Sequence, residues 1–175
     1  MRADARRNRD ALLAAARTVF VERGVDAPLD DVAKRAGIGN ATMYRHFPTR
    51  QDLIVAVYAD EVAELCARVP ALRAAHEPGE ALFVWLREFV AHVAGKRELA
   101  RSVTERRSTL FAEWHEAMTQ AGGELLADAK RAGVARAEVT VVDLLTLATG
   151  IAAHGGNAGQ HERLLALIRH GAQLP

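Results

Sequence analysis

The chain has 175 residues, half of them apolar, and its 23 Lys and Arg nearly balance its 22 Asp and Glu. It contains no run of about 18 apolar residues, and its charged start, Met1–Arg7, lacks the apolar stretch of a secretory signal, so we expect a cytoplasmic protein without a membrane span. The single cysteine, Cys66, excludes an internal disulfide and a multi-cysteine zinc site, and we expect no metal.

The charges are distributed unevenly along the chain. Residues 1–50 carry ten Lys or Arg against six Asp or Glu, whereas the remaining residues carry thirteen against sixteen. A basic segment on a nearly neutral protein indicates a polyanionic partner for that segment alone. The alternative is an ordinary solvated surface, and charge by itself favours that plainer interpretation.

The first predicted helix spans residues 9–24, after a lead-in turn at residues 5–8. Its apolar residues recur at helical spacing, at Leu12, Leu13, Ala16, Val19 and Phe20. Gly24 suits the left-handed position that ends a helix. Arginines crowd the helix start, where cations oppose the helix dipole. Phosphate binding by Arg6 and Arg7 would explain them, and a solvated terminus is the alternative.

Residues 29–47 have the pattern of two short helices joined at Gly37. The first has apolar residues at helical spacing, and the second begins after Gly39 and ends before Pro48, which cannot continue it. This is the pattern of a helix-turn-helix, whose second helix enters the DNA major groove and reads base edges. We expect five residues of the second helix to contact DNA: Asn40, Thr42, Tyr44, Arg45 and His46.

Three features of this second helix bear on the expectation. A buried tyrosine is the alternative for Tyr44, but Met43 and Phe47 already supply the apolar side of the helix. Arg45 can donate hydrogen bonds to base acceptors or to phosphates. Gly39 at the N-cap offers no side-chain acceptor, which predicts a weaker helix start than a serine would give.

Thr49 and Asp52 have the spacing of a capping box, which predicts a long helix that begins there and stops at Pro70. We therefore expect a DNA-binding domain at residues 1–48 and a second domain at residues 49–175. Further helical patterns occupy residues 80–94, 98–105, 108–121, 124–132, 140–154 and 160–171, with a break at Gly122 and Gly123. No strand alternation or internal repeat occurs, so the predicted fold class is all-α.

These N-terminal features resemble the TetR family of transcriptional regulators. The resemblance rests on the combination of Phe20–Gly24, Asp31–Ala33, Ala36–Ile38, Thr42–Phe47 and Thr49–Leu53. It implies a homodimeric regulator, usually a repressor, with a C-terminal domain that binds a small molecule and releases DNA. Arg50 matches the family's lysine at the start of the fourth helix, which implies a phosphate contact. Gly39 and Ala41 depart from the Ser and Gly common there.

The C-terminal layout resembles SbtR-like domains. A sensor of this kind needs a mostly apolar cavity with few polar groups. The candidate lining residues are Trp85, Phe89, His92, Leu110, Trp114, His115, Met118, Thr146 and Thr149. Aromatic and Met residues at helical spacing line a core more often than a pocket, and that alternative stays open.

Residues 140–154 are apolar nearly all round, which is unusual for a surface helix of a monomer. If this segment and the last helix packed against the same two segments of a second subunit about a two-fold axis, they would form a four-helix interface. The expected contact residues are Val141, Leu145, Ala148, Ala152, Leu164, Leu165 and Ile168. The alternative is a helix that is fully buried within one chain.

No catalytic residue and no cofactor are predicted. The His115-Glu116 pair lacks the second histidine of a zinc-protease motif, and the glycines at residues 155–159 do not follow a strand as a nucleotide fingerprint requires. We expect a homodimer that binds a double-stranded DNA operator and is released by a small-molecule effector. The competing hypothesis is a helical enzyme or carrier whose N-terminal helices are only structural.

Overall fold

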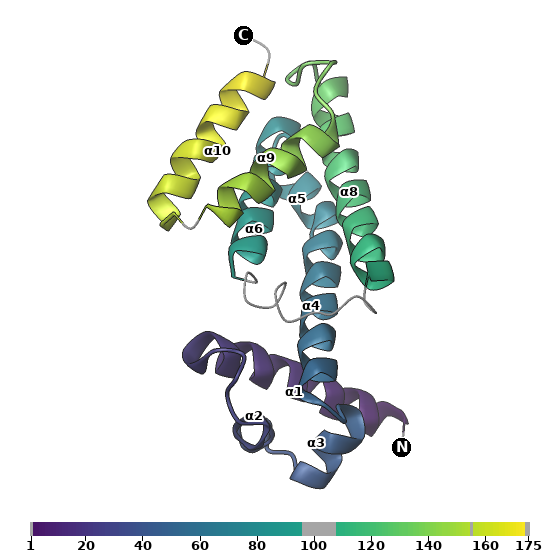
Figure 1. Ribbon diagram of the computed structural model, residues 1–175. Helices are drawn as coiled ribbons and strands as arrows, with labels where there is room; N and C mark the ends of the chain where they lie inside the picture. Colours follow the sequence, from purple (N-terminus) through teal and green to yellow (C-terminus); the bar gives the residue numbers. More distant parts are fainter. Residues whose placement is uncertain (1, 96–107, 155, 174–175) are drawn as a thin grey trace. The chain divides into compact units, whose positions relative to one another are not determined.

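The computed structural model describes residues 2–95, 108–154 and 156–173, and within these ranges the chain forms helices and no strand (Figure 1). The helices are α1 Arg2–Arg23, α2 Leu29–Ala36, α3 Asn40–His46, α4 Arg50–Ala67, α5 Val69–Ala75, α6 Pro78–Ala94, α8 Ser108–Arg131, α9 Val141–Ala153 and α10 Ala158–Ala172. The predicted all-α class is confirmed. The helix predicted at residues 98–105 lies outside the described residues.

Contacts divide the chain into two compact units, an N-terminal unit (Met1–Glu61) and a C-terminal unit (Val62–Pro175). The helix α4 contributes residues to both units. The domain boundary expected at Thr49 stays a prediction. No described helix combines the length and apolar composition that crossing a membrane requires.

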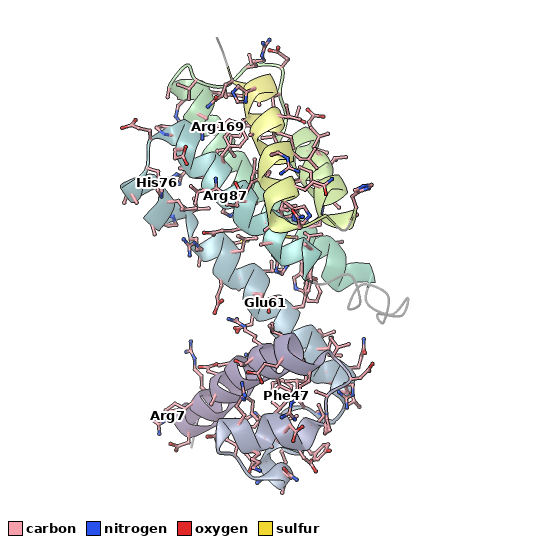
Figure 2. The ribbon with its side chains drawn as sticks, turned by 90° about the vertical axis from the view of Figure 1, so that its left-hand side faces the viewer. Arg7, Phe47, Glu61, His76, Arg87 and Arg169 are labelled. Carbon is pink, nitrogen blue, oxygen red and sulfur yellow. The ribbon has the colours of Figure 1, made fainter. Side chains whose placement is uncertain are left out.

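The N-terminal unit packs α1, α2, α3 and the first turns of α4 around one apolar cluster. The cluster is formed by residues that repeat at helical spacing, among them Leu12, Leu13, Val19, Val32, Met43, Phe47, Leu53 and Val57. Ile38 packs against it from the turn between α2 and α3, as the sequence predicts. Figure 2 shows Phe47 inside this unit and Arg7 towards one end of α1.

Two glycines end helices in this unit by adopting left-handed backbone angles. Gly24 has φ +82° after α1, and Gly37 has φ +69° after α2, conformations that favour glycine because it has no Cβ. The turn after α2 is closed by the amide of Ile38, which donates to the carbonyl of Ala33 at 3.0 Å. Both helix ends therefore lie where the sequence predicts them.

The start of α1 differs from the prediction. The helix begins at Arg2, so residues 5–8 form helical turns and not a lead-in turn. Asp4 lies in the first turn, where an acidic side chain is favourable to the helix dipole, and it pairs with Arg7 one turn later. These local interactions offset the unfavourable effect of the neighbouring arginines.

In the C-terminal unit, α6 packs against α5, α8, α9 and α10 (Figure 1). Its buried face includes Trp85, Leu86 and Phe89, with the rings of Trp85 and Phe89 stacked at 5.9 Å between centroids. The indole Nε1 of Trp85 donates to the carbonyl oxygen of Leu65 at 3.0 Å. This bond satisfies the one polar atom of a fully buried side chain.

The break predicted at Gly122 and Gly123 is wrong, because α8 continues through both residues to Arg131. A Cβ on Gly122 would lie 2.8 Å from Cζ3 of Trp85. The glycine is therefore needed for a large ring to approach the helix. Pro70 also differs from its predicted role, since it lies in the first turn of α5, where a missing N–H costs little.

The last two helices have well-capped starts. Thr140 and Asp143 form a complete capping box at α9, and Asn157 accepts a hydrogen bond from the amide of Gln160 at the start of α10. Hydrogen bonds from the hydroxyl and the amide of Thr140 lower the pKa of the Asp143 carboxyl below its ordinary value.

Charged contacts join α10 to α6. Arg87 pairs with Glu162 at 2.7 Å, and Arg169 pairs with Glu80 at 2.6 Å (Figure 2 labels both arginines). The Arg169 guanidinium also lies 5.5 Å from the centroid of the Phe83 ring. The final helix is thus held by charge as well as by apolar packing.

Candidate nucleic-acid interface

The helix α3 has seven residues and begins after a glycine cap. Gly39 has an extended conformation and no side chain to accept a hydrogen bond, as the sequence predicts. Its carbonyl oxygen accepts from the amides of Thr42 at 2.9 Å and Met43 at 3.1 Å. The start of α3 is therefore fixed through the backbone alone.

The side chains of α3 separate into a buried side and an exposed side. Met43 and the following Phe47 are buried in the apolar cluster. Tyr44 is 45% exposed, so the alternative of a buried tyrosine is wrong. Of the other residues predicted to contact DNA, Asn40 and Arg45 are exposed, and Thr42 and His46 are half-buried.

The guanidinium of Arg45 lies along its own helix. Its Nε donates to the carbonyl oxygen of Ala41 at 3.2 Å, and its Nη2 donates to the hydroxyl of Thr42 at 3.0 Å. These bonds hold the side chain on the exposed side of α3. A guanidinium has five N–H donors, so others are left for a base acceptor or a phosphate.

The arginines of α1 and α2 have different surroundings. Arg6 and Arg7 are exposed near the start of α1. Arg35 on α2 donates to both carboxylate oxygens of Glu22 at 2.9 Å, and Arg23 pairs with Asp31 at 2.6 Å. These two ion pairs join α1 to α2, and each neutralises the positive charge of its arginine.

Arg50 lies differently from the other residues predicted to contact DNA. Its Nη1 donates to the carbonyl oxygens of Val25 at 2.7 Å and Ala27 at 2.5 Å, in the loop between α1 and α2. The side chain is half-buried. Sequence reasoning missed this interaction, because both acceptors are backbone groups that any residue carries.

Both parts of the chain match known families. Residues 12–57 match the family described as bacterial regulatory proteins, tetR family, and residues 77–173 match the transcriptional regulator SbtR-like C-terminal domain. The chain belongs to the TetR family. It is a helix-turn-helix transcriptional regulator, and its C-terminal match agrees with the SbtR-like resemblance of the sequence.

Solved structures of TetR regulators are similar over nearly the whole chain. A TetR transcriptional regulator from Streptomyces coelicolor has 36% identity and a TM-score of 0.79, covering 94% of this chain and 98% of that one. A TetR regulatory protein from Mycobacterium vanbaalenii has 36% identity and a TM-score of 0.78, covering 99% of each chain. The likeness therefore includes both units.

Two curated relatives match over about a third of this chain. The HTH-type transcriptional activator FasR of Mycolicibacterium smegmatis is 40% identical over 62 residues, which are 35% of this chain and 28% of FasR. A Staphylococcus aureus HTH-type transcriptional regulator is 43% identical over 54 residues, which are 30% of this chain and 29% of that protein. The chain thus matches less than a third of the length of each of these two relatives.

The residues predicted to line an effector pocket do not share one environment in this TetR chain. Trp85, Phe89 and Met118 are buried, and His92 and Trp114 are half-buried. His115, Thr146 and Thr149 are exposed, so their side chains face solvent in a single chain, and their place in an effector pocket stays a prediction. The side chain of Leu110 lies outside the described residues.

The residues predicted for dimerisation also divide. Leu145, Ala148, Ala152 and Leu165 are buried in the chain's own core, so they offer little surface to a partner. Val141, Leu164 and Ile168 are half-buried. The division has a simple physical reason, because α9 uses one helical stripe for its own core and leaves a different one exposed. The interface itself stays a prediction.

Three other apolar residues provide surface on the last two helices. Val142, Leu147 and Leu167 are 54%, 53% and 69% exposed. Leu147 and Leu167 line a groove of about 430 Å³ together with Val139, Leu144, Ile168, Ala172 and neighbouring residues. In the sequence, these residues are the apolar positions of α9 and α10 that lie outside the buried stripe of each helix.

Proposed function

We propose that this regulator binds operator DNA as a homodimer, with α3 of each subunit in a major groove. The observation that carries the proposal is the division of α3: Met43 is buried, while Tyr44 and Arg45 are exposed on a helix without an acidic residue. Two such helices would read half-sites about one helical turn, roughly 34 Å, apart or at a longer spacing. DNA contacts by Arg6, Arg7, Asn40, Thr42 and His46 belong to the same proposal.

We expect the dimer to form by pairing of α9 and α10 with the same helices of a second copy. Exposed leucines and valines on neighbouring helices favour burial against a like surface, and a two-fold axis would bring the same stripe together from both subunits. The substitution Leu147→Glu should convert the dimer to a monomer in sedimentation, whereas Val21→Glu, at an exposed apolar residue of α1, should not. A dimer that survives Leu147→Glu would contradict this interface.

A small-molecule effector would control DNA binding from the C-terminal unit. The SbtR-like match and the buried aromatic residues of α6 support this step, and α4 contributes residues to both units. An effector that binds better to a conformation with the wrong spacing of the α3 helices would shift the population away from DNA. A protein of this kind acts in the cytoplasm, where a bacterial chromosome lies.

The direction of regulation follows from where the operator lies. Release by an effector favours repression as the usual outcome for this fold. FasR, which is 40% identical over 62 residues, is named an activator. A reporter assay with the chain's own promoter distinguishes the two, because a repressor lowers transcription until the effector is added.

DNA binding itself is tested with the chain's own upstream intergenic DNA. In fluorescence anisotropy, the wild-type protein should bind with an affinity that falls steeply with salt, because phosphate contacts dominate affinity. Tyr44→Ala and Arg45→Ala should each weaken binding by about tenfold, since a contact of this kind contributes roughly 1–3 kcal/mol. Lys34→Ala, at an exposed residue of α2, is the control.

The outcomes separate the proposal from its competitor. Unchanged affinity in Tyr44→Ala and Arg45→Ala would overturn the assignment of α3. If the protein were a helical enzyme or carrier, it would show no salt-dependent binding to any DNA fragment. Among the described residues, no group of His, Cys, Asp or Glu is arranged as a metal site.

A further inference from the structure

The guanidinium of Arg50, at the first residue of α4, is directed at the loop between α1 and α2. One nitrogen, Nη1, donates to two carbonyl oxygens at 2.7 Å and 2.5 Å, those of Val25 and Ala27. Hydrogen bonds from a charged donor are stronger than those between neutral groups. The two bonds join the start of one helix to a loop more than twenty residues earlier in the chain.

This loop determines how α2 leaves α1. Gly24 ends α1 with φ +82°, and the amide of Ala27 donates back to the carbonyl of Gly24 at 3.2 Å. Ala27 is buried, and Pro28 is the N-cap of α2. Because α2 packs against α3, a displacement of this loop would move both helices of the DNA-reading pair.

The surroundings of Arg50 differ from those expected of a phosphate contact. Arg50 is half-buried, whereas Arg6 on α1 is exposed. Both N–H groups of its Nη1 are directed at acceptors of the same chain, the carbonyl oxygens of Val25 and Ala27. A phosphate could bind this nitrogen only if those two bonds were broken.

We propose that Arg50 is a positioning residue that holds the α1–α2 loop and through it orients α3, and that it does not contact a DNA phosphate. The inference rests on the proposed DNA-binding function. It assigns to Arg50 a role that its place at the start of the fourth helix does not suggest.

The test compares Arg50→Ala and Arg50→Lys with Arg6→Ala in the full chain. Arg50→Lys keeps the positive charge but replaces the planar guanidinium by a compact ammonium group, which cannot present the same fork of donors. Two measurements are made on each protein: hydrogen exchange of the amides of residues 24–27 without DNA, and affinity for the upstream DNA fragment at several salt concentrations. A stoichiometric titration gives the active fraction, so that affinity refers to folded protein.

Both Arg50 variants should raise exchange at the loop amides and weaken DNA binding by about tenfold, the factor expected from removing a hydrogen bond to a charged group. The slope of log affinity against log salt should stay at the wild-type value in both. Arg6→Ala should leave loop exchange unchanged and reduce that slope by about 0.9 for each phosphate that the protein no longer neutralises.

Three results would overturn the proposal. One is a reduced salt slope in Arg50→Ala with affinity restored in Arg50→Lys, which indicates a phosphate contact. Another is unchanged loop exchange in both variants. The third is a lower active fraction whose folded molecules bind with wild-type affinity, which indicates a structural role alone. If the wild-type protein binds no fragment, the proposed function fails, and loop exchange still decides whether Arg50 holds the loop.

Discussion

The helices α3 and α9 are stabilised by different means. The helix α3 has seven residues, of which Met43 is buried, and starts at a glycine cap without a side-chain acceptor. The helix α9 has thirteen residues, five of them buried, and starts at a complete capping box. Because α3 is short and has no side-chain cap, it depends on the neighbouring helices for its order. Its exposed side chains are left for a partner outside the chain.

Arg45 on α3 differs from the arginines that form ion pairs in either unit. In the C-terminal unit, Arg68, Arg73, Arg87 and Arg169 each pair with a carboxylate of another helix. On α3, Arg45 bonds only to a carbonyl and a hydroxyl of its own helix, so its charge is not neutralised by an acid there. A positive charge without an acidic partner therefore lies on the helix where a polyanion is proposed to bind.

The largest expected effect is at the centre of the C-terminal unit. Trp85→Ala should lower its free energy of unfolding by about 3–5 kcal/mol, because it leaves a cavity where a fully buried ring lay. Trp114 remains as a fluorescent reporter, and both tryptophans belong to this unit, so urea denaturation followed by fluorescence reports on it alone. Trp85→Phe should cost less, and equal losses in the two variants would contradict a packing effect.

The adjacent glycines of α8 provide a matched pair for the next effect. Gly122→Ala should destabilise the C-terminal unit by about 1–3 kcal/mol, because the new Cβ would overlap the Trp85 ring. Gly123→Ala should stabilise it by up to about 1 kcal/mol, since its Cβ meets Val141 at an ordinary 3.9 Å and alanine favours the helix. Stabilisation by both substitutions in urea denaturation would show that helix propensity alone decides.

These glycines show what the sequence could not predict. Consecutive glycines indicate a break when only neighbours along the chain are considered, but the ring that requires Gly122 comes from α6. The exposed stripe of α9 was missed for a related reason, because a helix that is apolar all round does not show which side packs on its own chain. Such features depend on contacts between distant segments.

The helix-turn-helix was easier to predict, because its signals are local. Gly24 and Gly37 end helices by their own conformational freedom, and Met43 with Phe47 fixes which side of α3 is buried. Tyr44 and Arg45 then had to lie elsewhere on the helix. The direction of Arg50 could not be predicted, since its acceptors are carbonyl groups without a side-chain signature.

The cap of α9 should give a smaller effect that depends on pH. Thr140→Ala should destabilise the C-terminal unit by about 1 kcal/mol near neutral pH, as the loss of an N-cap usually does. The Thr140 bonds lower the pKa of Asp143 in the folded state, so the part of the cap that depends on the Asp143 carboxylate is present above the unfolded pKa of about 4 and is lost as the pH falls through the folded value.

Urea denaturation of the wild type and Thr140→Ala at pH 7 and pH 3 checks the expectation for the α9 cap. The difference in stability between the two proteins should narrow at the lower pH. A difference that stays the same would show that the Asp143 carboxylate adds nothing to the cap. Thr49 and Asp52 form the equivalent box at α4, which makes Thr49→Ala the corresponding test in the N-terminal unit.

The smallest expected effect is at the cap of α3, where a substitution can add the side-chain acceptor that α9 has and α3 lacks. Gly39 has an extended backbone and nothing within 4 Å of a new Cβ, so both Gly39→Ser and Gly39→Ala fit without strain. Serine should stabilise α3 by a few tenths of a kcal/mol and slow its amide exchange, whereas alanine should do the opposite. Because the two variants differ by one hydroxyl, opposite shifts would identify the missing side-chain acceptor as the weakness of α3. Equal shifts would mean that the order of α3 comes from packing of Met43 and Phe47 alone.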